Sequence, residues 1–336
     1  MKIFDYHNND TNIAITLLNK EFNIEKKNLY SIIFNSWCNN GTSEELVFLL
    51  KLLYYNSIFW NKNYRKIWLI YISCLLERGD TLTAKKVLNR YIQLYQILDM
   101  EKILPVAAFA LENNIISDKI KISAGLFNKL ENIRKHQTFE KYIQNKSIAF
   151  VGNGSQILQS NKGNEIDSHD IVIRFNKYKI NGYETDCGQK TDVWVTIDNY
   201  QEARNNINYI FFRQEYWNNF IDFNKISCIF NNCENIGVLS LKNLQFAKDC
   251  FGNDFYIPTT GCLTILAIYQ ILGNFKNVDF YGFNFLDNEI KPLDHYFANV
   301  SKRHQNKAEE MHNFTQESKF LKKFIKEHSG QNSYTT

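Results

Sequence analysis

Two glycines and two polar residues follow an apolar run in the middle of the chain. The sequence Gly152-Asn153-Gly154-Ser155 comes directly after Ile148–Val151. Glycine allows the backbone to approach a ligand closely. The third glycine of a dinucleotide fingerprint and the Gly-Lys-Ser/Thr ending of a Walker loop are both missing, so a tight turn without a ligand remains an alternative.

A second run, Ile171–Arg174, is followed by another polar residue, Asn176. An asparagine amide can hydrogen-bond to the edge of a base or to a ribose hydroxyl. Arg174 is interpreted as a buried ion-pair partner of Asp167 or Asp170. The two polar strand ends together predict one wall of a nucleotide site.

Hydroxyl side chains and a glycine precede a third apolar run. Thr259, Thr260 and Gly261 lead into Cys262–Leu272, which is predicted to be a helix. Backbone N–H groups at a helix N-terminus favour an anion, so a phosphate could bind here. An ordinary threonine cap is the alternative.

Two histidine motifs lie near the end of the chain. His295 and Tyr296 belong to the sequence Asp-His-Tyr-Phe, and His312 and Glu317 open an amphipathic helix that runs through Phe324. A lone histidine is usually structural or solvated. Two histidines behind a predicted phosphate site indicate chemistry, because an ordinary pKa of about 6.5 suits proton abstraction at neutral pH.

From about residue 145 onward, short β-rich runs alternate with turns and helical stretches. This alternation predicts an α/β domain with a Rossmann-like, mostly parallel sheet, in which ligands bind at the carboxyl ends of the strands. The predicted strands are Ile148–Val151, Ile171–Arg174, Val193–Ile197, Tyr209–Phe212, Ile236–Leu239 and Val278–Phe283.

The preceding part of the chain has helical periodicity, and glycine is nearly absent from it. We therefore expect an all-α, helical-hairpin-like domain over residues 1–144, a catalytic α/β domain over 145–330 and a flexible tail over 331–336. A role for the helical domain in contacting the acceptor, a partner or a membrane is left open.

The composition excludes several classes of protein. A net charge of +4 over 336 residues lacks the concentrated basic character of a nucleic-acid binder. No signal peptide or spanning segment is evident, so we expect a cytoplasmic protein, with peripheral contact at the inner face of the cytoplasmic membrane as an option. The seven cysteines form no CxxC pair, and no metal site or cofactor is expected.

These motifs resemble the animal-type sialyltransferase family. Gly-Asn-Gly with EIDSHDIVIRFN is similar to its large motif, and PTTG with VDFYGF is similar to its small motif. DHYF resembles the third motif, and His312 with Glu317 resembles the very small motif. The resemblance covers roughly residues 147 to 325 and implies a variant of the GT-A fold.

The resemblance also implies roles for the matched residues. Asn153, with the rest of the turn Gly152–Ser155, and Asn176 would contact cytidine monophosphate (CMP), and Thr259–Gly261 would hold its ribose or phosphate. His295 and Tyr296 would stabilise the departing phosphate. His312 would be the general base of an inverting transfer, and Glu317 would support local structure or the histidine.

The sequence departs from this family at several positions. The disulfide that joins the large and small motifs in the animal enzymes is missing, because Ile148 and about Leu272 stand at its positions. A second His-x4-Glu match begins at His304, which is the alternative base. Asp287-Asn288-Glu289 is the nearest approach to a DxD motif and is interpreted as a polar loop.

The expected reaction moves sialic acid, or a related nonulosonic acid, from its CMP-activated form (CMP-Neu5Ac for sialic acid) to a glycan hydroxyl without a metal. The expected setting is synthesis of bacterial capsule or lipopolysaccharide. One alternative is a Kdo or other nonulosonate transferase, retaining if Asp167, Asp170 or Asp294 is a nucleophile. Another is a non-catalytic CMP-binding or interaction protein. The oligomeric state is left open.

Overall fold

The computed structural model describes residues 26–55, 65–196, 207–212, 217–221, 233, 235–251, 258–283, 295–297 and 313–329. The described residues form two compact units. The first contains those up to Glu131 together with Trp217–Ile221, and the second contains the others. Residues 132–144, which the helical periodicity groups with the first domain, belong to the second unit.

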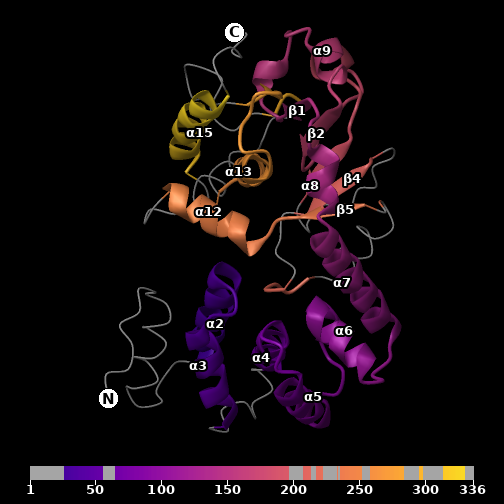
Figure 1. Cartoon of the computed structure of the whole chain (residues 1–336), viewed down its shortest axis with the longest axis vertical. Coiled ribbons are helices and arrows are strands. Elements are labelled where there is room, and N and C mark those ends of the chain that lie inside the picture. The colour runs from indigo at the N-terminus through magenta and orange to yellow at the C-terminus, as the bar shows by residue number, and fades with distance from the viewer. Residues whose placement is uncertain are drawn as a thin grey trace. The chain divides into compact units, whose positions relative to one another are not determined.

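The first unit is built from helices (Figure 1). Helices α4 and α5 form a hairpin around Gly79, and the Asp80 side chain caps α5 by accepting a hydrogen bond from the backbone N–H of Thr83 at 3.0 Å. Among the described helices, none has the length and apolarity needed to cross a bilayer. The elements are α2 (Lys26–Asn40), α3 (Glu44–Tyr55), α4 (Arg65–Glu77), α5 (Thr81–Tyr95), η3 (Met100–Lys102), α6 (Leu104–Glu112) and the first part of α7 (Asp118–His136).

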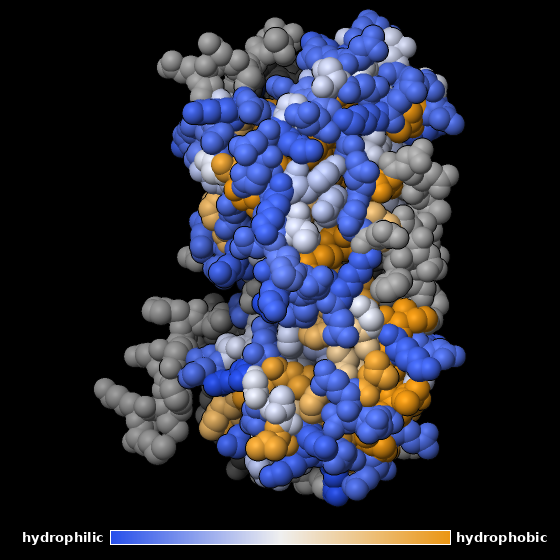
Figure 2. Space-filling view, turned by 45° about the vertical axis from the view of Figure 1, so that its right-hand side comes forward, coloured by the Kyte–Doolittle hydropathy of each residue, from blue (hydrophilic) through white to orange (hydrophobic). Residues whose placement is uncertain are grey.

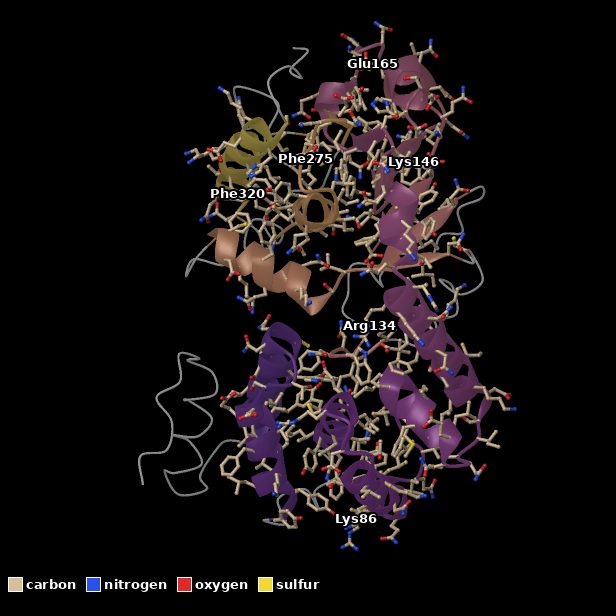
Figure 3. The ribbon with its side chains drawn as sticks, viewed as in Figure 1. Lys86, Arg134, Lys146, Glu165, Phe275 and Phe320 are labelled. Atoms are coloured by element: carbon tan, nitrogen blue, oxygen red, sulfur yellow. The ribbon has the colours of Figure 1, made fainter. Side chains whose placement is uncertain are left out.

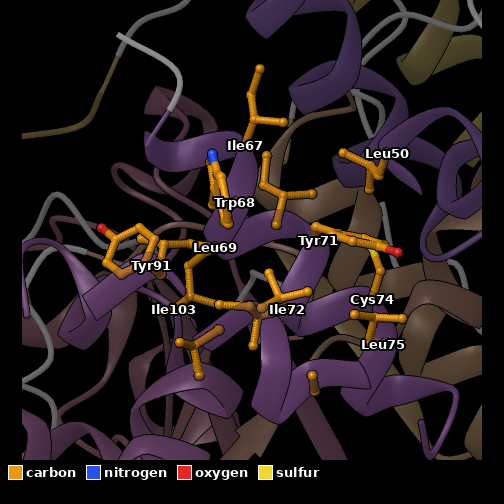
Figure 4. Packing of buried hydrophobic residues seen from close by; sticks show 14 of the residues in the cluster. Leu50, Ile67, Trp68, Leu69, Tyr71, Ile72, Cys74, Leu75, Tyr91 and Ile103 are labelled. Atoms are coloured by element: carbon orange, nitrogen blue, oxygen red, sulfur yellow. The ribbon is translucent and has the colours of Figure 1, made fainter. Parts of the chain in front are cut away.

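Helix α4 is the centre of this unit. Its residues Ile67–Leu75 are all buried, and Trp68 and Tyr71 pack with Tyr91 of α5 in one apolar cluster (Figure 4). A helix that is apolar on all sides is stable only where neighbours surround it. On the face shown in Figure 2, hydrophobic side chains reach the surface mainly over this unit.

The segment Trp217–Ile221, which lies between β4 and β5 in the chain, packs into the first unit. Trp217 donates its indole N–H to Glu131 at 2.8 Å, and its ring meets Phe127 edge-on at 5.0 Å. Phe220 meets Trp37 in the same manner. The helical core therefore includes residues that are distant in sequence.

The second unit contains a six-stranded sheet in the order β5-β4-β3-β2-β1-β6, and every pair in it is parallel. All six predicted strands are present, and the predicted α/β class with a parallel sheet is confirmed. The strands are β1 (Ile148–Val151), β2 (Ile171–Phe175), β3 (Val193–Thr196), β4 (Tyr209–Phe212), β5 (Ile236–Val238) and β6 (Val278–Tyr281).

The order of the strands reverses at β1. The chain runs from β1 to β5 on one side and returns to place β6 on the other side of β1. The carboxyl ends beside such a reversal border the crevice in which α/β proteins bind ligands. The turn Gly152–Ser155 is at this point of the sheet.

One face of the sheet is covered by helices with aromatic side chains. Phe275 is fully buried and meets Phe280 of β6 edge-on at 5.5 Å, and Phe320 of α15 contacts Phe251 of α12 (Figure 3). Phe275 also meets Tyr269 of α13 at 5.4 Å and Phe324 of α15 at 6.2 Å, and these contacts hold both helices over the strands. The helices of this unit are α8 (Thr138–Ile143), η4 (Ser155–Ile157), α9 (Gly163–Asp167), α10 (Glu184–Cys187), α12 (Leu241–Phe251), α13 (Thr260–Leu272) and α15 (Phe314–His328).

The interpretation of Arg174 as an ion-pair partner is wrong. Its fully buried guanidinium donates to the carbonyls of Lys190 and Cys187 and to the Thr191 hydroxyl. Backbone N–H groups hold the two carboxylates instead. Asp167 accepts from Gln189 and Lys190, and Asp170 accepts from Ser147.

His169 joins the start of β2 to the edge strand β6. Its Nε2 lies 2.9 Å from Oδ2 of Asp279, and its Nδ1 lies 3.0 Å from the carbonyl of Glu165 and 3.2 Å from that of Ile166. The Tyr281 ring meets the imidazole edge-on, and the Lys190 ammonium binds the carbonyl of His169. Because both ring nitrogens face acceptors, the protonated form is favoured, and the hydrogen bond to Asp279 raises the pKa of His169.

The Asp279→Asn variant tests this ion pair. A raised folded-state pKa gives stability that is complete below the ordinary histidine pKa and is lost as the pH rises through the raised value. We expect the substitution to lower the free energy of unfolding by up to about 1 kcal/mol near pH 5.5, where histidine (ordinary pKa about 6.5) is charged, and by less near pH 9. Urea unfolding at both pH values measures this, and an equal loss at both would contradict the assignment.

Candidate functional site

The turn after β1 and the end of β6 are joined through their backbones. The N–H of Gly152 donates to the carbonyl of Tyr281 at 2.7 Å, and that of Gly154 donates to the carbonyl of Gly282 at 2.9 Å. A Cβ on Gly152 would lie 2.4 Å from the Gly282 oxygen, and Gly282 has a left-handed φ of +67°. Glycine is therefore required at this crossing, and β6 ends at Tyr281, before the predicted Phe283.

Asn153 holds three segments together. Its Nδ2 donates to the carbonyls of Phe175 and Lys177, each at 3.1 Å, and its own carbonyl accepts from the N–H of Tyr296 at 3.0 Å. The amide has two hydrogen atoms, and both are used on protein carbonyls. The side chain of Asn153 can thus offer a ligand only its Oδ1.

Asn176 presents a buried acceptor at the carboxyl end of β2. Its backbone is left-handed, with φ 50°, and is fixed by bonds to Val195 and to the indole of Trp194. Its Oδ1 is buried and has no hydrogen-bond partner among the described residues. Such an atom costs about 1–3 kcal/mol unless a donor reaches it, which is the property of a ligand-binding group.

The Thr259–Gly261 motif forms the first turn of α13, as predicted. Thr259 caps the helix by accepting from the N–H of Cys262 at 3.2 Å. The Phe283 ring lies between this turn and the turn after β1. A Cβ atom added to Gly152 would lie 3.2 Å from the ring, and one added to Gly261 would lie 3.3 Å from it. The two glycine turns, distant in sequence, are therefore neighbours, and the predicted anion site borders the predicted nucleotide wall.

Glu317 contacts Thr259. Its carboxylate accepts from the N–H of Thr259 at 2.8 Å and from the Thr259 hydroxyl at 2.7 Å, and the side chain is 7% exposed. Asn313 caps α15 and thereby fixes the position of Glu317. The geometry places this glutamate beside the predicted anion site, where it supports the cap of α13.

His295 and Tyr296 lie against the same turn. His295 forms an antiparallel bridge with Gly154 and stacks on Phe297. The hydroxyl of Tyr296 donates to the carbonyl of Lys179 and accepts from its N–H, and burial raises the pKa of this phenol. Tyr296 therefore uses its hydroxyl on the protein, whereas His295 stands beside the glycine turn.

Other candidates are placed differently. Ser155 begins η4 directly after the turn. Asp167 accepts hydrogen bonds from the loop before β3, and Asp170 accepts from Ser147 beside the start of β2. Both lie at the amino ends of the strands, away from the predicted site. His304, His312, Asp294 and the stretch from Asp287 to Glu289 lie outside the described residues.

Sequence reasoning missed one residue of the site, Phe283. Its position directly after a glycine at the end of a strand could have indicated a role in the site. Because Phe283 continues the apolar run, it was predicted to belong to the strand. Within the ranges that the structure describes, no group of three or more histidine, cysteine or acidic side chains is arranged to hold a metal.

A family model described as glycosyltransferase family 29 (sialyltransferase) matches residues 101–329. The chain is 43% identical over 66 residues to CMP-N-acetylneuraminate-beta-galactosamide-alpha-2,3-sialyltransferase 1 of Gallus gallus, a match over 19% of each protein. It is 52% identical over 50 residues to beta-galactoside alpha-2,6-sialyltransferase 2 of Rattus norvegicus, over 15% of this chain and 10% of that protein. These matches span a fifth or less of the relatives' length. A crystal structure of a mammalian sialyltransferase has 19% identity and a TM-score of 0.42, over 56% of this chain and 69% of that one.

Removal of the Glu317 carboxylate is expected to destabilise the second unit. Glu317→Ala leaves the Thr259 N–H and hydroxyl without their buried acceptor, a loss of about 2–4 kcal/mol in the free energy of unfolding. Glu317→Gln should lose less, because the amide oxygen can still accept from the N–H. Glu327→Ala on the exposed side of α15, where Glu327 pairs with Lys323 at 3.8 Å, is the control and should change stability by less than about 0.5 kcal/mol. Urea unfolding measures all three, and equal losses for Glu317→Ala and Glu327→Ala would contradict the assigned contact.

Proposed function

Because the chain belongs to glycosyltransferase family 29, the sialyltransferases, we propose that it transfers sialic acid, or a related nonulosonic acid, from CMP to a glycan hydroxyl. The observation that carries this proposal is the buried Oδ1 of Asn176 at the carboxyl end of β2, which no described residue reaches with a hydrogen bond. It lies at the strand ends where a nucleotide is expected.

The donor is bound in our proposal by groups of complementary chemistry. The amino group of cytosine and the ribose hydroxyls are hydrogen-bond donors, and the Oδ1 atoms of Asn176 and Asn153 are acceptors. The phosphate takes the N-terminus of α13 at Thr260 and Gly261, where the helix dipole favours negative charge. Thr259, held by Glu317, keeps this helix end in place.

The reaction then needs a stabilised leaving group and a positioned nucleophile. The anomeric carbon is tertiary and adjoins a carboxylate, so its bond to the phosphate oxygen weakens toward an oxocarbenium-like state. His295 stabilises the departing CMP in this proposal. His312 takes the proton of the acceptor hydroxyl. The hydroxyl oxygen bonds to the anomeric carbon from the face opposite the departing phosphate, which inverts the configuration.

We propose that no metal takes part, because a single phosphate leaves and a helix N-terminus with a histidine can balance its charge. The name of one relative specifies a β-galactosamide and that of the other a β-galactoside, and a galactose-terminated glycan is the acceptor that we propose to test first. The setting that we propose is bacterial surface-glycan synthesis, in capsule or lipopolysaccharide, on the cytoplasmic side of the membrane. It is supported by the replacement of the expected disulfide positions by Ile148 and about Leu272.

Purified protein incubated with CMP-Neu5Ac and a β-galactoside in EDTA should release CMP and form a sialylated product. CMP-Kdo is tested in parallel to identify the donor. NMR of the first-formed product reports the anomeric configuration. Binding of CMP without transfer from either donor would overturn the proposed activity and favour a binding protein.

Two variants separate binding from chemistry. Asn176→Ala removes the buried acceptor and should weaken CMP binding about tenfold or more, the loss of one hydrogen bond worth about 1.5 kcal/mol. His312→Ala should lower kcat by about 10²–10⁴ and leave the Kd for CMP nearly unchanged. Calorimetry and initial rates measure the two effects, and His304→Ala is the matched control. Full activity of His312→Ala would move the base elsewhere.

A further inference from the structure

A cavity of about 510 Å³ opens in the helical unit, far from the motifs in sequence. It lies between α3, α4 and the start of α5. Its volume is within the range of about 300–1,000 Å³ that small-ligand sites occupy. None of the residues that line it belongs to the proposed catalytic machinery.

Helix α3 presents one long face to this cavity. Glu44, Phe48, Lys51 and Tyr55 all line it, at spacings of three or four residues that place them on the same side of a helix. Phe48 is 48% exposed and Tyr55 is 70% exposed. Two large aromatic side chains are thus open to a ligand, and the buried Tyr71 of α4 lies behind them.

Charges of both signs share the same opening. Arg78 lies 3.7 Å from Glu44, in a pair exposed enough to contribute little to stability. The hydrogen bond from the backbone N–H of Thr83 lowers the pKa of Asp80, which therefore remains ionised, and Lys51 is on the facing helix. Hydrogen-bond donors and acceptors of both charges therefore line the same cavity as the aromatic side chains.

This combination disfavours other ligand classes. Five of the eleven lining residues are charged, whereas the core of a protein–protein interface is depleted in charge. Three carboxylates against two cations repel a nucleic acid or an anionic lipid surface. A pyranose fits, because its C–H face can lie on an aromatic ring while its hydroxyls both donate to carboxylates and accept from cations.

We propose that this cavity is a second glycan-binding site, which holds an uncharged stretch of the acceptor saccharide through Phe48, Tyr55 and the Arg78–Glu44 pair. The inference depends on the proposed function only for the choice of a glycan as ligand. A site of this kind raises the local concentration of a long acceptor, because its second attachment is intramolecular. Short acceptors gain nothing from it.

Titration of the isotope-labelled full chain with poly-N-acetyllactosamine, without any donor sugar, tests the site directly. We expect saturable shifts of the amide signals of residues 44–55 and 71–83. Tyr55→Ala and Arg78→Ala should weaken this binding about tenfold, a loss of about 1.4 kcal/mol. Leu82→Ala and Lys85→Ala, exposed on α5 and outside the cavity, are the controls and should bind as the parent does.

The outcomes separate this inference from the proposed activity, since the titration needs no turnover. If the chain is also active, Tyr55→Ala should raise KM for the polymer and leave KM for methyl β-galactoside and for the donor unchanged. Equal affinity of Tyr55→Ala and Leu82→Ala for the polymer would overturn the inference. So would shifts of the same signals by an amphipathic helical peptide but not by the saccharide, which would assign the cavity to a protein partner.

Discussion

The closure of the turn after β1 against the end of β6 is the constraint on which the rest of the site depends. Two backbone hydrogen bonds join these strand ends, and glycine is needed at both crossing points because a side chain on either would enter the other backbone. The Phe283 ring, directly after this closure, lies between the turn and the start of α13. The turn after β1, which is the predicted nucleotide wall, and the N-terminus of α13 become neighbours through this one aromatic side chain.

The site is held together by contacts between distant parts of the sequence. Glu317 and Thr259 are 58 residues apart, and the amide of Asn153 reaches across to the end of β2. Each contact satisfies a buried polar group, so each motif depends on another for its stability as well as for its function. These contacts depend on the positions of the motifs at one edge of the sheet and not on the order of the motifs along the chain.

The sequence predicted the strands well, since their apolar runs are short, rich in β-branched and aromatic residues and bounded by turn residues, which together separate a buried strand from a buried helix. It predicted the candidate residues by type but not by partner. Asn153 was expected to bind a ligand, yet its amide hydrogens serve two carbonyls; Arg174 was assigned to a carboxylate and donates to carbonyls instead. Such pairings are decided by tertiary geometry, because the N–H groups of an amide or a guanidinium donate to any acceptor that the fold brings within reach. The boundary of the helical unit at Glu131 could not be predicted either, since the helical periodicity of α7 continues across it.

The helical unit depends for its packing on the segment Trp217–Ile221, which comes from a distant part of the chain. This segment supplies ring contacts to Phe127 and Trp37, a backbone bond to Lys102 and a side-chain bond to Glu131. Helices cut from the chain near residue 131 would lack the piece that fills their own interior. The two units are thus not exchangeable modules, because recombination at a single point in the sequence cannot transfer the helices together with the segment between β4 and β5 that packs among them.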